Sequence, residues 1–290
     1  MSELFDAGFF ARLRKLKLAT RIRLDRGQSG GRKSSAKGSS VEFSDFREYI
    51  PGDDIRRIDW NVYGRLNKLF IKQFMEEKEA CYHLFLDSSA SMRFGARSKA
   101  VMAQRLSAVF AWLVLNQLDR VELFTIQEGR LAKTSPLVGK GSFSRLLNDL
   151  EQVQFTGKTG LSEAIRKTPL HGRGICIIIS DFLDPDGMEE AMRYLAFKRQ
   201  EILLVQVLAR EEVEFDAEGT LAIEDMETGE QVRVTMNRQA LELYEATLLY
   251  HNQELVHLAK RYGAAVVSVI SDEPLEKVVF ETLKQKGIFG

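Results

Sequence analysis

The sequence has little cysteine, no long apolar run and no excess of charge of either sign. Two cysteines among 290 residues do not make the disulfide framework of a small secreted domain, so the thiols are expected to be reduced. No apolar stretch approaches the roughly 18–20 residues that a helix needs to cross a bilayer. The first residues, MSELFDAGFFARLRKLKL, place acids before the first basic side chain and lack a signal-peptide cleavage pattern. These absences predict a cytoplasmic protein with no membrane span.

Signatures of several enzyme classes are also missing. Residues 157–159, GKT, resemble the end of a phosphate-binding loop, but that motif needs a glycine five positions before its Gly-Lys, where this chain has Gln152. Haloacid-dehalogenase-type phosphatases need a second aspartate two residues after the first, and here Ser89 follows Asp87 at that spacing. The four histidines show no zinc-binding spacing. A Ser-His-Asp triad is not evident, although triads assemble in space and are not excluded by sequence.

The formal net charge is zero, so the chain as a whole offers no electrostatic attraction to nucleic acid or to a membrane. Residues 10–37 nevertheless hold ten Lys or Arg side chains and a single acid, Asp25. One interpretation is a basic arm that binds nucleic acid or anionic lipid. The favoured interpretation is an amphipathic helix over FFARLRKLKLATRIRL that packs its Phe and Leu side chains, because no nucleic-acid recognition motif accompanies the basic residues. No nucleic-acid partner is therefore expected.

Composition divides the chain into three parts. Residues 1–40 combine this basic helix with GQSGGRKSSAKGSS, a stretch that has nothing to bury and predicts a flexible linker. Residues 41–78 are rich in aromatic and β-branched side chains and are broken at Pro51-Gly52, which predicts short strands joined by turns. Residues 79–290 alternate strand-like and helix-like segments.

That alternation predicts an α/β domain. Strand-like runs such as ICIII and ILLVQVL are continuously apolar, as expected when helices cover both faces of a parallel sheet. We therefore expect a doubly wound, mostly parallel sheet. Residues 211–235, which contain Gly219 and Gly229, interrupt the rhythm and predict an inserted β-hairpin or two.

Three polar clusters fall at loops of this expected sheet. The first is DSSAS, residues 87–91, directly after the strand-like ACYHLFLD. The second is Thr159 within GKTG, just before a helical segment, and the third is Asp181, which follows the apolar IIIS. Because ligands bind beyond the carboxyl ends of the strands in a doubly wound sheet, we expect the three clusters to converge.

The converging side chains would offer two carboxylates and three hydroxyl groups, namely Asp87, Asp181, Ser89, Ser91 and Thr159. All are hard oxygen donors, which suit Mg²⁺ or Mn²⁺ rather than zinc or copper. Only two formal negative charges would face the dication, so we expect it to be weakly bound and to remain electrophilic. A free coordination position could take water or a carboxylate from another protein.

This order of residues resembles the metal-ion-dependent adhesion site of von Willebrand factor type A domains. Asp87, Ser89 and Ser91 match the D-x-S-x-S places, Thr159 matches the threonine of a G-x-T-x-L loop, and Asp181 matches the second aspartate. The resemblance covers roughly residues 79–290. It implies a Rossmann-like fold, hydroxyl groups that touch the metal directly, and carboxylates that act partly through water.

Each of these residues also has a purely structural interpretation. Asp87 and the serines that follow it could cap the next helix, Thr159 could be a turn residue, and Asp181 could cap the helix that contains MEEAMRYL. The occurrence of all five at three such loops favours the metal site.

An upstream segment narrows the resemblance. FREYIPGDDIRRIDW is similar to the bacterial domain-of-unknown-function family 58, which carries R-x-Y-x-P-G-D-D-x-R-x-I-D-W before a von Willebrand A-like domain. The matching residues are Arg47, Tyr49, Pro51, Gly52, Asp53, Asp54, Arg56, Ile58, Asp59 and Trp60. The family is typically encoded beside MoxR-type AAA+ ATPases, which implies such an ATPase or its client as the partner. Many members have N-terminal membrane helices, and this chain departs from them.

The charged side chains between Arg47 and Asp59 allow two interpretations. They could form a buried salt-bridge knot that fixes this subdomain to the sheet, or they could present a charged face to a partner. The knot is favoured, because Pro51-Gly52 and Trp60 indicate a fixed, packed turn.

Two functions fit the sequence. The first is a non-enzymatic, divalent-metal-dependent protein–protein interaction module, whose metal is completed by an acidic residue of the partner. The second is a metal-dependent hydrolase in which the same ion activates water. The first is favoured because no general base is evident, and the nearest candidates, Asp184 and Asp186, resemble helix-cap acids.

Overall fold

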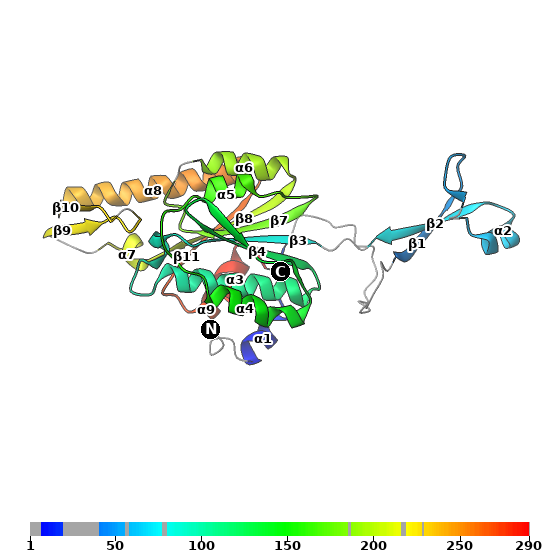
Figure 1. Ribbon diagram of the computed structural model, residues 1–290, viewed down its shortest axis with the longest axis horizontal. Coiled ribbons are helices and arrows are strands. Elements are labelled where there is room, and N and C mark those ends of the chain that lie inside the picture. Colours follow the sequence, from blue (N-terminus) through cyan, green and yellow to red (C-terminus); the bar gives the residue numbers. More distant parts are fainter. Residues whose placement is uncertain are drawn as a thin grey trace. The chain divides into compact units, whose positions relative to one another are not determined.

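The structure is a computed structural model with two compact units (Figure 1). One unit is made of Met1–Ile22 and Ala80–Gly290, and the other of Arg23–Glu79. The described residues are 7–19, 41–55, 58–76, 80–184, 187–215, 219–227 and 229–289. The expected linker at residues 27–40 lies outside them, as do Arg56 and Asp186.

The larger unit is built on one seven-stranded sheet, in the order β11-β8-β7-β3-β4-β5, with β6 paired to β4. Strands β11, β8, β7, β3 and β4 run parallel, and β5 and β6 are antiparallel to β4. Their bounds are β3 Cys81–Asp87, β4 Arg120–Gln127, β5 Arg130–Lys133, β6 Leu137–Val138, β7 Gly174–Ser180, β8 Gln200–Leu208 and β11 Ala265–Ile270. The prediction of a doubly wound, mostly parallel α/β fold is confirmed.

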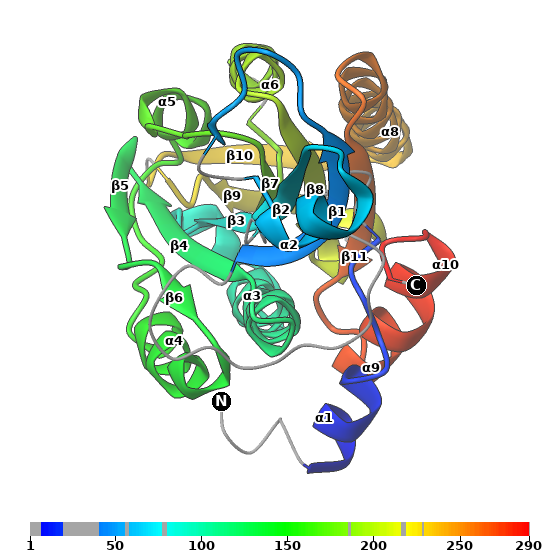
Figure 2. The ribbon, with the colours of Figure 1, turned by 90° about the vertical axis from the view of Figure 1, so that its right-hand side faces the viewer.

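Helices cover both faces of this sheet (Figure 2). Helices α5, α6 and α8 lie over one face, and α3, α4 and the C-terminal helices lie over the other. Their bounds are α3 Lys99–Asn116, α4 Phe143–Glu151, α5 Leu161–Lys167, α6 Met188–Phe197, α7 Arg210–Val213, α8 Arg238–Arg261, α9 Leu275–Lys277 and α10 Leu283–Gln285. Among the described residues, none of the helices combines the length and the apolarity needed to cross a bilayer.

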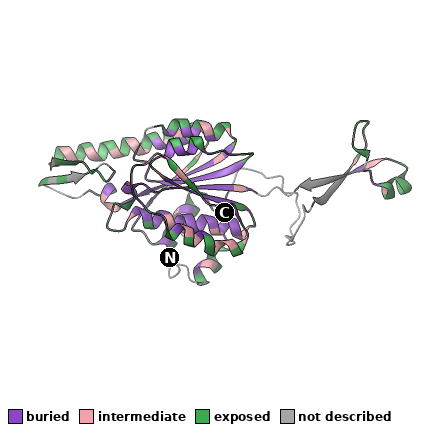
Figure 3. Cartoon of the chain, in the orientation of Figure 1, coloured by how far each residue is buried: buried purple, intermediate pink, exposed green. Residues whose placement is uncertain are grey.

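The core lies between the sheet and these helices (Figure 3). Every residue of β7 is buried, which explains why GICIIIS is continuously apolar. Phe85 and Phe124, on neighbouring strands, are fully buried and stack with their ring centroids 4.7 Å apart. Burying a side chain of this size stabilises the fold by roughly 1.5–3 kcal/mol, so these strands hold their carboxyl ends in fixed positions.

The basic N-terminal segment packs as expected but is a shorter helix. Helix α1 spans Ala7–Leu13, within the larger unit. Phe9 packs against Phe280 and Phe10 stacks on Trp112, with ring centroids 5.4 and 5.2 Å apart. The helix expected over FFARLRKLKLATRIRL therefore does not continue through its described part. Leu18 instead forms a β-bridge with Phe289.

The insertion is one hairpin preceded by a helical turn. Strands β9 (Gly219–Glu224) and β10 (Gln231–Met236) pair antiparallel and lead into α8. The first residues of the predicted β segment belong to α7, where the Glu212 side chain accepts a hydrogen bond of 2.7 Å from the Ala209 backbone and so closes the turn. The prediction of β structure from residue 211 onwards is wrong for this part.

In the smaller unit, strands β1 (Val41–Glu48) and β2 (Phe70–Glu76) pair antiparallel. Residues Trp60–Leu66 form helix α2 rather than the expected strand. The reason is local: the Asp59 carboxylate accepts hydrogen bonds from the Asn61 and Val62 backbones, at 2.8 and 3.3 Å, and so caps a helix.

The strand order places a switch of winding between β3 and β7. From β3 the chain passes through α3 to β4 on one side, and β7 then adds on the other side. Asp87 is the last residue of β3, and Asp181 directly follows β7. The two aspartates therefore leave neighbouring strands at the point where ligands bind in open α/β sheets.

Candidate metal site

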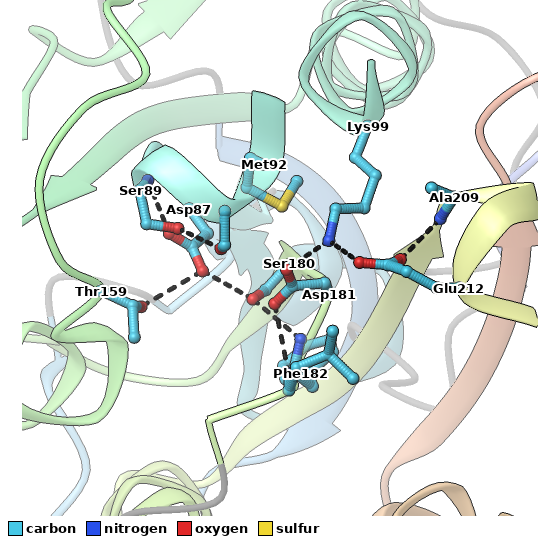
Figure 4. Close-up of polar contacts among 12 residues, drawn as sticks. Asp87, Ser89, Met92, Lys99, Thr159, Ser180, Asp181, Phe182, Ala209 and Glu212 are labelled. Carbon is cyan, nitrogen blue, oxygen red and sulfur yellow. Dashed lines mark hydrogen bonds and ion pairs between the residues drawn. The ribbon is translucent and has the colours of Figure 1, made fainter. Parts of the chain in front are cut away.

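Asp87 is at the centre of a buried polar cluster (Figure 4). Its side chain is 1% exposed. One carboxylate oxygen, Oδ1, accepts a hydrogen bond from the Ser89 backbone at 3.0 Å. The other, Oδ2, accepts from the Thr159 hydroxyl at 3.2 Å and from the Ser180 hydroxyl at 2.6 Å. Three loops that are distant in sequence thus meet at one carboxylate.

The loop after Asp87 turns the alternate serines toward each other. The Ser89 and Ser91 hydroxyl oxygens lie 3.0 Å apart, at the start of the 3₁₀ turn Ala90–Arg93. Ser88 faces the other way, and its hydroxyl donates to the Ile126 carbonyl at 2.8 Å. Ser89 makes no side-chain capping bond to this turn, and α3 is capped by Ser98. The helix-cap interpretation of Ser89 and Ser91 is therefore wrong.

Close backbone packing fixes the loop that carries Thr159. The Ala90 N–H donates to the Gly157 carbonyl at 2.9 Å, which ties this loop to the Asp87 loop. On the other side, Gly160 packs against Gly129 so closely that a Cβ at position 160 would lie 2.2 Å from the Gly129 nitrogen. Glycine is required for this close approach. The packing of the two backbones holds the Thr159 hydroxyl within reach of Asp87.

Asp181 lies beside Asp87 but takes a different partner. Its Oδ2 accepts from the Lys99 ammonium at 2.7 Å, and the same ammonium contacts Glu212 Oε1 at 2.6 Å (Figure 4). Lys99 is fully buried in the first turn of α3. Asp181 Oδ1 accepts from the Leu183 backbone at 3.2 Å, and the residue that precedes α6 is Gly187, so Asp181 does not cap that helix.

Negative charge accumulates around Asp87. Burial raises the pKa of the Asp87 carboxyl above its ordinary value and the charge of Asp181 raises it further, against opposing hydrogen bonds from Ser180 and Ser89. Burial also raises the pKa of Glu212, although Lys99 opposes this. Within the described part of the chain, no Lys or Arg forms an ion pair with Asp87. The carboxylate pair Asp87 and Asp181 is therefore short of positive charge.

A further acid comes from the hairpin of the insertion. Glu227, in the turn between β9 and β10, accepts a hydrogen bond at 3.2 Å from the Thr159 backbone. Its side chain is half-buried. Burial raises the pKa of Glu227, the Thr159 bond opposes this, and the charges of Asp87 and Asp181 raise it again.

The cluster borders a cavity of about 260 Å³. Asp87, Thr159 and Asp181 line it, whereas Ser89 and Ser91 do not. Asp184, named above as a candidate base, is also part of the wall. A small ion or the tip of a side chain can therefore reach the Asp87 carboxylate from this side.

The donors present fit Mg²⁺ or Mn²⁺, as carboxylate and hydroxyl oxygens do in general. A hydroxyl group can donate its proton to Asp87 and still offer a lone pair to a cation. The expectation that only two negative charges face the ion was incomplete, because it missed Lys99, Glu212 and Glu227. Lys99 offsets part of the charge of Asp181, and the two glutamates add to the negative side.

The sequence carried little signal for these three. Lys99 begins a mostly apolar helix and reads as a surface cation, and the two glutamates lie in the insertion, far from the motif in sequence. The mostly apolar sequence that follows Lys99 was the only sign that α3 is largely buried.

A second group of potential ligands lies at the opposite end of β3. Side-chain atoms of Cys81, His83 and Glu122 come within 4.8 Å of one another. His83 Nδ1 lies 3.1 Å from Glu122 Oε2, and Lys133 contacts Glu122 Oε1 at 3.1 Å. Both oxygens of Glu122 thus face a basic group and its negative charge is balanced locally, so this group fits a cation less well.

In the smaller unit, the ion pair between the described motif residues Arg47 and Asp53 is partly exposed rather than part of a buried knot. Arg47 donates to Asp53 at 2.8 Å, and their side chains are 40% and 24% exposed. Asp53 also accepts from the Ile50 backbone at 2.9 Å, which closes the Pro51-Gly52 turn. Trp60 is 64% exposed, so the expectation of a packed Trp60 is wrong within this unit. Arg56 lies outside the described residues.

The other motif residues have mixed positions. Tyr49 donates from its backbone to Leu69, and Ile58 is buried and bridges to Ile71. Asp59 is the buried helix cap described above, and Asp54 is exposed. The motif therefore shapes the turn and the start of α2, and it leaves Asp54 and Trp60 exposed within the unit.

Comparison with known proteins places the sequence among uncharacterised relatives. The family model described as "Protein of unknown function DUF58" matches residues 45–254. The uncharacterized protein Rv1480 of Mycobacterium tuberculosis is 26% identical over 274 residues, which cover 92% of this chain and 86% of that protein.

Solved structures of similar form include the conserved hypothetical protein BatB of Bacteroides thetaiotaomicron, at 18% identity and a TM-score of 0.44. The match covers 72% of this chain and 98% of BatB. The SpRpn10 VWA domain matches at 12% identity and a TM-score of 0.36, over 70% of this chain and 94% of that domain. At this level of similarity neither structure bears on the chemistry of the site.

Proposed function

Since this chain belongs to the DUF58 family of proteins of unknown function, we propose a function for it from the geometry at Asp87. It is a non-enzymatic, divalent-metal-dependent protein–protein interaction module. The cation, Mg²⁺ or Mn²⁺, is held by Asp87, Ser89, Ser91, Thr159 and Asp181. An acidic side chain of the partner protein completes its coordination.

One observation carries this proposal: a buried carboxylate at the switch point of the sheet, without an ion pair among the described residues, accepts hydrogen bonds from the Thr159 and Ser180 hydroxyl groups and from the Ser89 backbone. Burying unpaired charge costs several kcal/mol per ion. A dication would remove that cost at Asp87, and it would also attract Asp181, whose charge Lys99 already offsets in part. Ser89, Ser91 and Thr159 would supply neutral oxygens, so the bound ion would keep positive charge for a further anionic ligand.

The metal can be tested by thermal unfolding of the purified chain. A cation at about a hundred times its Kd stabilises the folded state by roughly 2.7 kcal/mol. We therefore expect Mg²⁺ or Mn²⁺ to raise the melting temperature of the wild type, on the order of 5–10 °C for a chain of this length. Asp87→Asn should abolish the rise, because it removes the central charge and keeps the side-chain shape.

Glu163→Gln is the matched control. Glu163 lines the same cavity but is exposed and pairs with Lys167, outside the donor set. This variant should respond to the metal like the wild type. A metal response that persists in Asp87→Asn, or no response of the wild type at all, would count against the site.

The partner follows from the family resemblance given above. A MoxR-type AAA+ ATPase, or its client, would present the acidic side chain, in a chaperone-like assembly or maturation step. The cytoplasmic location expected from the sequence also stays a prediction.

Capture experiments can test the partner. Wild-type protein immobilised in Mn²⁺ should retain the ATPase or its client from a lysate of the source organism, and chelator or Asp87→Asn should release it. If the partner is still retained in chelator and by Asp87→Asn, the contact surface would instead be the charged turn around Asp53.

A hydrolase is the alternative, supported by Asp184, which lines the same cavity as Asp87 and Asp181. In that case the ion would activate water and Asp184 would accept a proton. Metal-dependent turnover of a phosphate ester that is lost in Asp181→Ala would favour the hydrolase over the binding module.

A further inference from the structure

The turn between β9 and β10 brings an acidic side chain of the insertion to the candidate metal site. Thr159 contacts both: its backbone N–H donates to Glu227 Oε1 at 3.2 Å, and its hydroxyl donates to Asp87 Oδ2, also at 3.2 Å. One residue thus bridges the site and a segment 68 positions further along the chain. The hairpin places Glu227 next to a metal-site donor.

Hydrogen bonds within the turn hold Glu227 in this position. The Glu227 N–H donates to the Asp225 side chain at 2.8 Å, and the Gly229 N–H donates to the Asp225 carbonyl at 2.7 Å. Gly229 has a φ of 72°, which glycine adopts without strain. The turn is therefore built around Asp225 and presents the next acid, Glu227, outward from the hairpin toward Thr159.

The surroundings of Glu227 are unfavourable to a carboxylate in the absence of a cation. Its neighbours Asp87, Asp181 and Asp184 are near enough for their charges to act on it. The hydrogen bond from the Thr159 backbone N–H only weakly offsets the repulsion from these three negative charges. Among the described residues, no donor bonds to the second oxygen, Oε2. A cation beside Thr159 would turn this repulsion into attraction.

We propose that Glu227 is an acidic ligand that the chain supplies to its own metal site, in the place that a partner's carboxylate would take. This inference rests on the proposed function. It implies that the hairpin competes with the partner: an incoming acid has to displace the β9–β10 turn before it reaches the ion. The Thr159 backbone N–H would then be available to donate a hydrogen bond to the partner's carboxylate instead.

Mn²⁺ itself is the probe. Binding to the full chain is followed by the electron paramagnetic resonance of free Mn²⁺, and water on the bound ion by proton relaxation. Glu227→Gln keeps the acceptor oxygen for Thr159 but removes the charge. We expect its Kd for Mn²⁺ to rise roughly tenfold, about 1.4 kcal/mol, and the relaxation per bound ion to increase because water replaces the carboxylate.

Glu230→Gln is the matched control, since Glu230 is an exposed acid of the same turn. It should keep the wild-type Kd and relaxation. If Glu230→Gln weakens Mn²⁺ binding as much as Glu227→Gln does, the effect comes from the overall negative charge of the hairpin, and the role of Glu227 as a ligand is overturned.

Asp87→Asn separates this inference from the proposed function. If the wild type does not bind Mn²⁺, or Asp87→Asn binds it equally well, the metal site itself fails and the ligand role of Glu227 fails with it. If binding depends on Asp87 but Glu227→Gln leaves both the Kd and the relaxation unchanged, the site stands and the role of Glu227 is overturned.

Discussion

The two ends of strand β3 both bury ionisable side chains, yet they balance the charge in different ways. At the carboxyl end, Asp87 is buried beside Asp181 and takes only hydroxyl and backbone donors among the described residues. At the start of the strand, His83 is equally buried beside Glu122. There the acid lies between two basic groups, the His83 ring and the Lys133 ammonium, each at 3.1 Å.

The register of the sheet explains why the ionisable side chains at the start of β3 pack against one another. His83 is opposite Glu122 on β4 and opposite Cys176 on β7, so the three side chains share one face. A Cβ at Gly174 would lie 3.3 Å from His83 Nε2, so the β7 backbone covers this side of the ring. The group is packed against its neighbours and has no surplus charge.

The comparison shows that buried charge alone does not mark a cation site. Both ends of β3 gather potential ligands. The difference is a surplus of carboxylates at one end, beside a cavity, and a balanced set at the other. Experiments that change one charge at each end can test this difference.

Lys99 should give the largest effect. Lys99→Met leaves Asp181 and Glu212 buried without their shared cation, and breaking a buried pair in this way costs roughly 3–5 kcal/mol. Unfolding in urea measures the loss of free energy. Because Asp181 loses its ammonium partner, we also expect Mn²⁺ to restore more stability to Lys99→Met than it adds to the wild type.

The same change at the other end is the control. Lys133 contacts Glu122, but its side chain is 41% exposed. Lys133→Met should cost about 1 kcal/mol or less, as for partly exposed pairs, and should give no extra response to Mn²⁺. Equal losses in the two variants would mean that the ends of β3 do not differ as described.

Much of this arrangement could be predicted from the sequence, because it follows from local pattern. The apolar, β-branched run GICIIIS favours a strand covered on both sides, and D-x-S-x-S after a strand places Asp87 at a carboxyl end. Once the sheet is parallel, the ends of neighbouring strands meet at one edge, which brings Asp87 and Asp181 together. Thr159 lies in the loop between α4 and α5, and its place beside Asp87 depends on the backbone contacts of Gly157 and Gly160.

The parts that sequence did not predict depend on contacts between distant segments. Lys99 pairs with acids 82 and 113 positions away, and no local pattern encodes such a distance. The helix α2 was missed for a different reason. WNVYGRL has the aromatic and β-branched side chains of a strand, and the capping carboxylate of Asp59 outweighs that preference.

The smallest expected effect is a pH dependence from His83. Burial lowers the pKa of His83 below its ordinary value of 6.5, and Lys133 lowers it further, against the charge and hydrogen bond of Glu122. Between the two pKa values the unfolded chain binds a proton that the folded chain does not. Stability is therefore complete above pH 6.5 and is lost as the pH falls toward the lower, folded-state pKa.

One group contributes at most about 1.4 kcal/mol per pH unit. His83→Gln should remove this slope, measured as the difference in unfolding free energy between wild type and variant from pH 7.5 down to pH 5. Asp87→Asn should leave the slope in place, because an acid whose pKa is raised by burial loses stability as the pH rises, the opposite sign. If Asp87→Asn removed the slope and His83→Gln kept it, the titrating group would lie at the carboxyl end of β3 and the charge balance assigned to His83, Glu122 and Lys133 would be wrong.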